Sequence, residues 1–216
     1  MKKVYYYLSL FIFLVTISCG GGSSSSGGGG FNWPSGDYQY LNAHNAGINN
    51  GIIIRWETPI FVNTNGIPGA EDSFRQWGLP FSFVNADPPE GIVVRIGNLP
   101  AGTCGVTESR WFLSNGRMIS ATITIRADLR GCNNTITHEA GHALGIHVHT
   151  ADGGLMDLTG GNGQITSPVR NMINLLYAFP VGTDITPQLS GMNPSLLKKF
   201  AYKKIPDGGI VRWVDR

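Results

Sequence analysis

The chain has 216 residues, a formal net charge of +2 and only 14% charged residues. Such a small charge, with no basic stripe, gives no reason to expect a nucleic-acid partner. The part that follows the glycine- and serine-rich tract, residues 31–216, has the length of one domain and can bury a sizeable core.

The N-terminus has the pattern of an export signal. Two lysines follow Met1, residues 4–17 are apolar, and Ser18 and Cys19 come next. The apolar run is too short for a comfortable membrane span. The pattern resembles a bacterial lipoprotein signal, which implies a signal peptide at residues 1–18 and a lipid on Cys19. The alternative is ordinary secretion, with cleavage near Ser18 and no anchor.

Residues 20–30 are all glycine or serine, which is typical of a flexible tether. Together with the signal, this predicts an exported protein that is lipid-anchored to a bacterial cell membrane, at the outer membrane or the cell surface. We expect the domain at residues 31–216 to be a monomer.

Strands and helices alternate along this domain. Apolar and β-branched runs predict strands, and apolar residues at helical spacing predict helices. Phe74 and Trp77 should face the core from the first helix, and Val169, Met172, Ile173 and Leu176 from the last. The predicted strands span 51–56, 81–84, 91–97 and 121–127, and the predicted helices span 70–77, 134–144 and 168–177.

The helix predicted at 134–144 carries the most informative motif. His138, Glu139, His142 and Gly145 form an H-E-x-x-H-x-x-G run. Residues four apart lie on one helix face, so both histidines can bind the same metal ion. Glu139 would then lie close enough to take a proton from water activated by that metal. Gly145 can adopt a left-handed conformation, end the helix and turn the chain.

A catalytic zinc site usually has three protein ligands and one open position. No glutamate follows His142, which excludes the class of zinc peptidase whose third ligand is a later glutamate. His147 and His149 are the best candidates for the third ligand. Asp152 and Asp157 are weaker ones.

Residues 138–156 resemble the metzincin metallopeptidases, and most closely their matrixin-type branch. That family has H-E-x-x-H-x-x-G-x-x-H followed by a methionine-containing turn, and Met156 lies at a suitable distance for the turn. Val148 stands at the position of the third family histidine. One inserted residue makes His149 the ligand, and one deleted residue makes it His147. We favour His149, because an insertion only lengthens a surface turn.

The resemblance implies an α+β fold of metzincin type. It would have a mixed twisted sheet, an active-site helix, a methionine turn and a C-terminal helix. It also implies a zinc endopeptidase that acts on protein or peptide substrates, with Glu139 as general base and His138, His142 and His149 holding Zn²⁺. In that fold the strand before the metal helix, here 120–128, would hold substrate along an exposed edge. The alternative is a surface-anchored binding protein of the same fold whose metal site is degenerate.

If Cys19 carries a lipid, Cys104 and Cys132 are the remaining cysteines. One pair in an exported domain predicts a disulfide, and the alternative is a thiol that binds the zinc as an inhibitor. His44 is expected to be a surface or core residue rather than a ligand. Residues 210–213 repeat the pattern of 53–56, which we interpret as a coincidental pair of strands.

Overall fold

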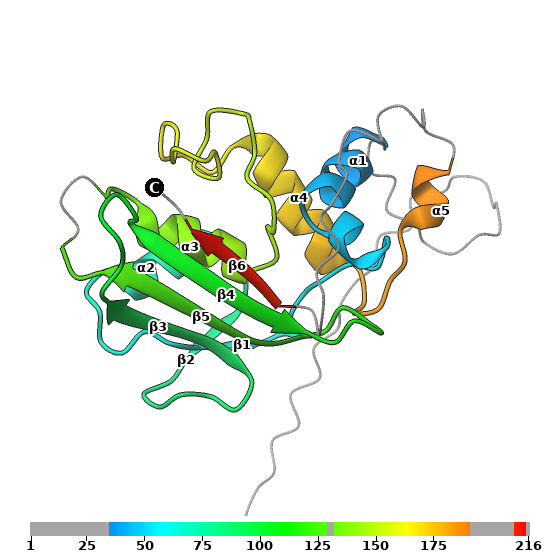
Figure 1. Ribbon diagram of the computed structural model, residues 1–216. Coiled ribbons are helices and arrows are strands. Elements are labelled where there is room, and N and C mark those ends of the chain that lie inside the picture. The colour runs from blue at the N-terminus through cyan, green and yellow to red at the C-terminus, as the bar shows by residue number, and fades with distance from the viewer. Residues whose placement is uncertain (1–34, 129–131, 191–209, 215–216) are drawn as a thin grey trace, which may run out of the picture. The chain divides into compact units, whose positions relative to one another are not determined.

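The computed structural model describes residues 35–128, 132–190 and 210–214, the last range as backbone only. The predicted signal peptide, Cys19 and the tether lie outside the described residues. The described part is a mixed α+β structure, as predicted, with one six-stranded sheet and helices packed against it (Figure 1). Among the described helices, none has both the length and the apolar character needed to cross a membrane.

The sheet has the order β2-β1-β3-β5-β4-β6. Strands β2, β1, β3 and β5 run parallel, β4 is antiparallel to β5, and β6 is antiparallel to β4. The strands are β1 (Ile60–Asn63), β2 (Phe81–Phe83), β3 (Gly91–Gly97), β4 (Gly105–Trp111), β5 (Met118–Arg126) and β6 (Ile210–Val214).

The position of β5 corrects one prediction. The segment 120–128 was expected to border a cleft with an exposed edge, but β5 pairs with β3 on one side and β4 on the other. Its alternating burial was detected correctly. Alternation reports which face of a strand is covered, and it carries no information about hydrogen bonding in the plane of the sheet.

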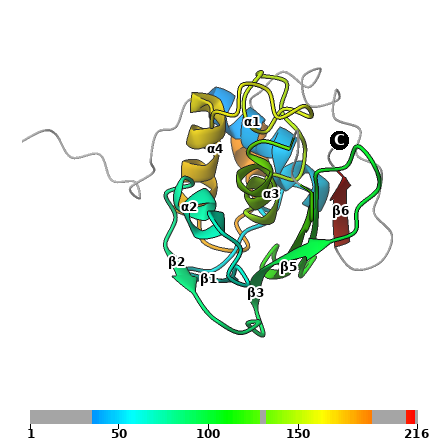
Figure 2. The same ribbon diagram turned by 90° about the vertical axis from the view of Figure 1, so that its left-hand side faces the viewer.

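Helices α2 and α3 lie on one face of the sheet, with α3 across β4 and β5 (Figure 2). Helix α4 packs against α1. The helices are α1 (Ser35–His44), α2 (Ala70–Arg75), α3 (Thr135–Ala143), α4 (Ser167–Ala178) and α5 (Thr186–Leu189), with a 3₁₀ turn, η1, at Ala46–Asn49.

The core lies between the sheet and these helices. Phe74 and Trp77 are buried there, as predicted. Helix α4 begins with Pro168 in its first turn, where a missing N–H costs nothing. The four predicted apolar positions of α4 are all buried, which confirms the helical spacing: Val169, Met172, Ile173 and Leu176.

The segment 51–56 is not a strand, contrary to prediction. Only Ile52 and Arg55 take part in isolated bridges. The buried side chain of Asn45 pairs with the backbone of Ile54, since its Oδ1 accepts from Ile54 N–H and its Nδ2 donates to Ile54 O. At Ile54 an amide side chain therefore takes the place of a neighbouring strand, while Ile53 and Arg55 bond to the backbone of Thr183 and Gly116.

No pattern in the sequence predicted α1, β1, β4 or α5, whereas the strand interpreted at 210–213 is confirmed as β6. Strand β4 was not predicted because its residues facing α3 include Gly105, Thr107 and Ser109. A strand whose inner face is polar lacks the usual apolar alternation.

Candidate metal centre

Helix α3 presents His138 and His142 from one face, and both side chains are buried. Nδ1 of His138 lies 2.5 Å from the carbonyl oxygen of Leu155, and Nδ1 of His142 lies 2.5 Å from that of Ile146. A carbonyl oxygen can only accept, so each Nδ1 carries the proton and donates it. Backbone contacts thus fix both rings and leave Nε2 as the ligand atom.

The chain turns immediately after α3. Gly145 has a φ of 115°, which confirms the predicted turn. The Nδ2 group of Asn45 donates to both Gly145 O and Ile54 O, each over 2.7 Å. This amide is fully buried and fixes the end of the metal helix against the segment 51–56.

A second contact from the N-terminal part holds the next residues. The N–H of His147 donates to the carbonyl of His44 over 2.7 Å. The ring Nδ1 of His44 lies 3.0 Å from the carbonyl oxygen of Val148. Burial lowers the pKa of His44, so its ring is neutral near pH 7 and donates from Nδ1. These two bonds orient the segment that ends in His149.

Three imidazoles converge as a result. Nε2 of His142 lies 3.1 Å from Nε2 of His138 and 3.2 Å from Nε2 of His149. One ligand atom from each ring lies within 4.8 Å of the others. Tetrahedral zinc with Zn–N bonds of about 2.0–2.1 Å needs ligand nitrogens roughly 3.3 Å apart. The donor set and two of the spacings therefore fit zinc.

His147 lies apart from this group. Its ring is fully buried and stacks on Trp111, with 5.2 Å between ring centroids. Neither ring nitrogen has a hydrogen-bond partner among the described residues. Burial lowers the pKa of His147 to about 3, so the ring is a neutral core group at physiological pH.

Glu139 lies on the β4 side of α3. The hydroxyl of Thr107 donates to Oε2 of its carboxylate and lies 3.2 Å from its backbone oxygen. Gly105 leaves room for the same carboxylate, because a Cβ there would lie 2.2 Å from Oε1. Strand β4 therefore shapes the pocket for Glu139, which is fully buried.

A small cavity of about 80 Å³ lies beside His138 and Glu139. That volume is enough to admit water, since one water needs roughly 10–15 Å³ of accessible space. The rest of its lining comes from the disulfide, the start of α3 and the loop that follows Met156: Cys104, Cys132, Asn133, Thr135, Leu155, Leu158, Thr159 and Gly160.

Met156 is fully buried and lies in a turn that packs against α3. A Cβ on Gly141 would come 2.5 Å from its Sδ and 2.7 Å from the Trp77 ring. Position 141 therefore has to be glycine for the turn at Met156 to pack so closely against α3.

The two aspartates considered as ligands lie outside the histidine group described above. Asp152 accepts hydrogen bonds from Thr150, Thr166, Tyr40 and the N–H of Gly154. Burial opposes ionisation of Asp152, but these bonds outweigh it and lower its pKa.

Asp157 instead accepts from the backbone N–H and the hydroxyl of Thr159. Both aspartates thus stabilise the loop that follows His149.

Cys104 and Cys132 form the predicted disulfide, with 5.5 Å between their Cα atoms. The bond connects the residue before β4 with the segment that leads into α3. Because both sulfurs are used in the bond, the alternative of a cysteine thiol on the metal is wrong.

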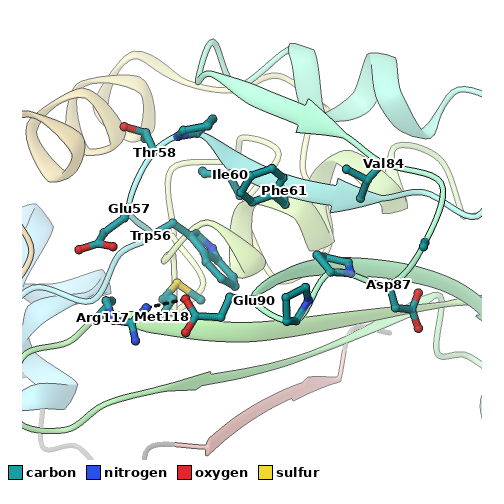
Figure 3. A pocket seen from close by; sticks show the side chains of 14 residues that line it. Trp56, Glu57, Thr58, Ile60, Phe61, Val84, Asp87, Glu90, Arg117 and Met118 are labelled. Atoms are coloured by element: carbon teal, nitrogen blue, oxygen red, sulfur yellow. Dashed lines mark hydrogen bonds and ion pairs between the residues drawn. The ribbon is translucent and has the colours of Figure 1, made fainter.

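A larger cavity, of about 700 Å³, lies elsewhere. Figure 3 shows Trp56, Ile60 and Phe61 around it, with the Arg117–Glu90 ion pair at its margin. Its lining, drawn from the described residues, contains no histidine and no cysteine. The larger cavity is therefore not the one that lies beside the candidate metal-binding histidines.

Comparisons with known proteins do not identify the chain: no family model matches it, and neither the curated proteins nor the solved structures include a match. The site must be judged on its own geometry.

Sequence reasoning missed several residues that support this geometry. Asn45 and His44 are about 100 positions from the segment they hold, so no local pattern could have indicated them. Thr107 and Gly105 lie in the strand that was not predicted. A buried polar residue in a short strand is the kind of signal that could have revealed Thr107.

Proposed function

We propose that this protein is a zinc-dependent endopeptidase with a metzincin-like catalytic domain. The observation that carries the proposal is the convergence of three histidine Nε2 atoms, with Glu139 and His138 lining the same small cavity. His138, His142 and His149 would hold the metal. When bound, zinc would supply a Lewis acid and lower the pKa of a coordinated water towards neutrality.

Glu139 would act as the general base. Its carboxylate would take a proton from the attacking water and pass it to the leaving amine. The hydroxyl of Thr107 would hold the carboxylate in one orientation for both transfers. The small cavity beside His138 and Glu139 would give water access to this otherwise buried group.

The substrate would be an extended peptide. An unpaired strand edge offers N–H and C=O groups that can hold such a peptide. We assign this role to the outer edge of β4, because β4 is the strand in contact with Glu139; β6 pairs with that edge in the structure.

The full burial of Glu139 favours a second candidate, a protein that binds metal and peptide without turnover. Both candidates predict bound zinc, and only the peptidase predicts cleavage.

The test is to measure zinc in the purified protein together with cleavage of casein, before and after chelation. We expect about one zinc per chain and cleavage that stops with chelator and returns with zinc. Zinc without cleavage would support the binding protein, and absence of zinc would reject both.

We also propose that the protein is exported and anchored through a lipid on Cys19, as its N-terminal pattern indicates. The Gly/Ser tether has no apolar residues that could hold the protein at a bilayer. Cys19→Ala should therefore move the processed protein from the membrane fraction to the soluble fraction. A processed variant that stays with membranes would contradict the anchor.

A further inference from the structure

Strand β6 covers the outer edge of β4. Five consecutive residues pair antiparallel with it, from Val106 opposite Val214 to Arg110 opposite Ile210 (Figure 1). Since β5 pairs with the inner edge, both edges of β4 are used within the described part of the chain.

The pairing runs past the residue that holds Glu139. Thr107, whose hydroxyl donates to Glu139, is opposite Trp213, the second of the five pairs in the β4–β6 ladder. An extended peptide that added to β4 beside Glu139 would need the same backbone N–H and C=O groups that β6 uses. A β-strand edge accepts one strand at a time.

We propose that β6 is an intramolecular competitor for the peptide-binding edge of β4, so a substrate must displace residues 210–214 before it can bind. The proposal rests on the function proposed above, because it concerns the substrate edge of that same metal site. It predicts a protein whose activity towards peptides is restrained by its own C-terminal strand.

The connection to β6 makes the competition effective. Residues 190–209 join α5 to β6, a stretch of 20 residues counted from the sequence. A strand that belongs to the same chain as the edge competes with free peptide at an effective concentration, on the order of millimolar for a short connection. For a short strand that binds an edge weakly, this would raise the apparent KM for a peptide by about two- to tenfold.

Proline substitutions in the full chain test the proposal. The N–H groups of successive strand residues point in opposite directions, so only one of Val211 and Arg212 donates towards β4. Proline at the residue that donates towards β4 removes a hydrogen bond of the β4–β6 ladder. Proline at the neighbouring residue removes an N–H that points away from β4. Val211→Pro and Arg212→Pro thus form a matched pair of weakened strand and control.

We expect one of the two variants to lower the KM for a fluorogenic peptide by about two- to tenfold, with kcat and zinc content unchanged. The other variant should resemble the unmodified protein. Removal of residues 210–216 should lower KM at least as much, while removal of 215–216, which lie beyond the ladder, should not. Equal KM values for all these proteins would overturn the inference and leave the peptidase proposal standing.

A binding measurement separates this inference from catalysis. The probe is a labelled peptide with the sequence of residues 208–216, observed by fluorescence anisotropy. It should bind the strand-weakened proline variant more tightly than the unmodified chain, and it should do so equally in a Glu139→Gln background. Equal binding to both proteins, or no binding to either, would overturn the inference even if proteolysis were present.

Discussion

Helix α3 carries Glu139, and strand β4 contacts its carboxylate, but the roles of the two elements differ in how easily they can be predicted from sequence. The helix carries its candidate metal ligands at a spacing of four, so the proposed chemistry can be recognised in eight consecutive residues. The strand contributes one hydroxyl, one glycine and a hydrogen-bonding edge. Candidate metal ligands can thus be recognised from local sequence, whereas the strand residues that contact Glu139 are recognised only from the folded structure.

The largest expected effect concerns the third ligand. His149→Ala should lower zinc affinity by more than about 100-fold, because loss of a direct ligand exceeds the 10- to 100-fold cost of disturbing its supports. Peptidase activity should disappear with the metal. Zinc retained per chain after dialysis is the measurement.

His147→Phe is the matched control, since phenylalanine keeps the stacking on Trp111 and removes both ring nitrogens. It should retain zinc and activity. Loss of zinc in this variant alone would transfer the ligand role to His147.

The next effect concerns the base on α3. Glu139→Gln should keep zinc bound and lower kcat by about 10²–10⁴-fold, the usual contribution of a positioned acid–base group. Steady-state kinetics on a peptide and metal analysis of the same sample provide the comparison. Turnover equal to that of the unmodified enzyme would exclude Glu139 as the base.

The covalent connection between the two elements should matter for stability. With Cys104 and Cys132 28 residues apart, replacing both by alanine should lower the unfolding free energy by about 3–4 kcal/mol. Chemical denaturation of the oxidised protein and the variant measures the difference. Reduction of the unmodified protein should reproduce the variant's curve, and coincident curves for oxidised protein and variant would contradict the expectation.

The smallest effect concerns β4. Thr107→Val keeps the shape of the side chain but removes the hydroxyl that donates to Glu139. We expect kcat/KM to fall by about 10- to 150-fold, since a hydrogen bond to a charged group contributes about 1.5–3 kcal/mol. Thr107→Ser should restore most of the activity because it returns the donor. Full activity of the valine variant would show that the Thr107 hydroxyl does not contribute to catalysis.

Elements with a regular apolar pattern, such as α3, were predicted from the sequence, whereas elements without one, such as β4, were not. The positions of α2, α3, α4, β2, β3 and β5 follow from periodicity and apolar runs, and the structure confirms them to within a few residues. The disulfide follows from the cysteine count.

The failures share a physical cause. Residues 51–56 looked like a strand because β-branched residues favour extended backbone, yet their hydrogen bonds go partly to the Asn45 side chain. Strand 120–128 was taken for an edge although strand order is decided by contacts far apart in sequence. The preference for His149 over His147 is not one of these failures, but the contacts with His44 and Trp111 that distinguish the two residues are also long-range.

Those contacts of His44 carry a consequence for the order in which the site assembles. His138 and His142 come into register as soon as one helical turn forms, but His149 is oriented by a residue 104 positions before Val148. Closing so long a loop is slow compared with forming a helix turn. A newly made chain should therefore pass through a stage with two histidines in place, at which it captures metal weakly. Tight capture should begin only when α1 docks on the segment after α3, so the rate of zinc uptake by refolding protein would report the arrival of α1.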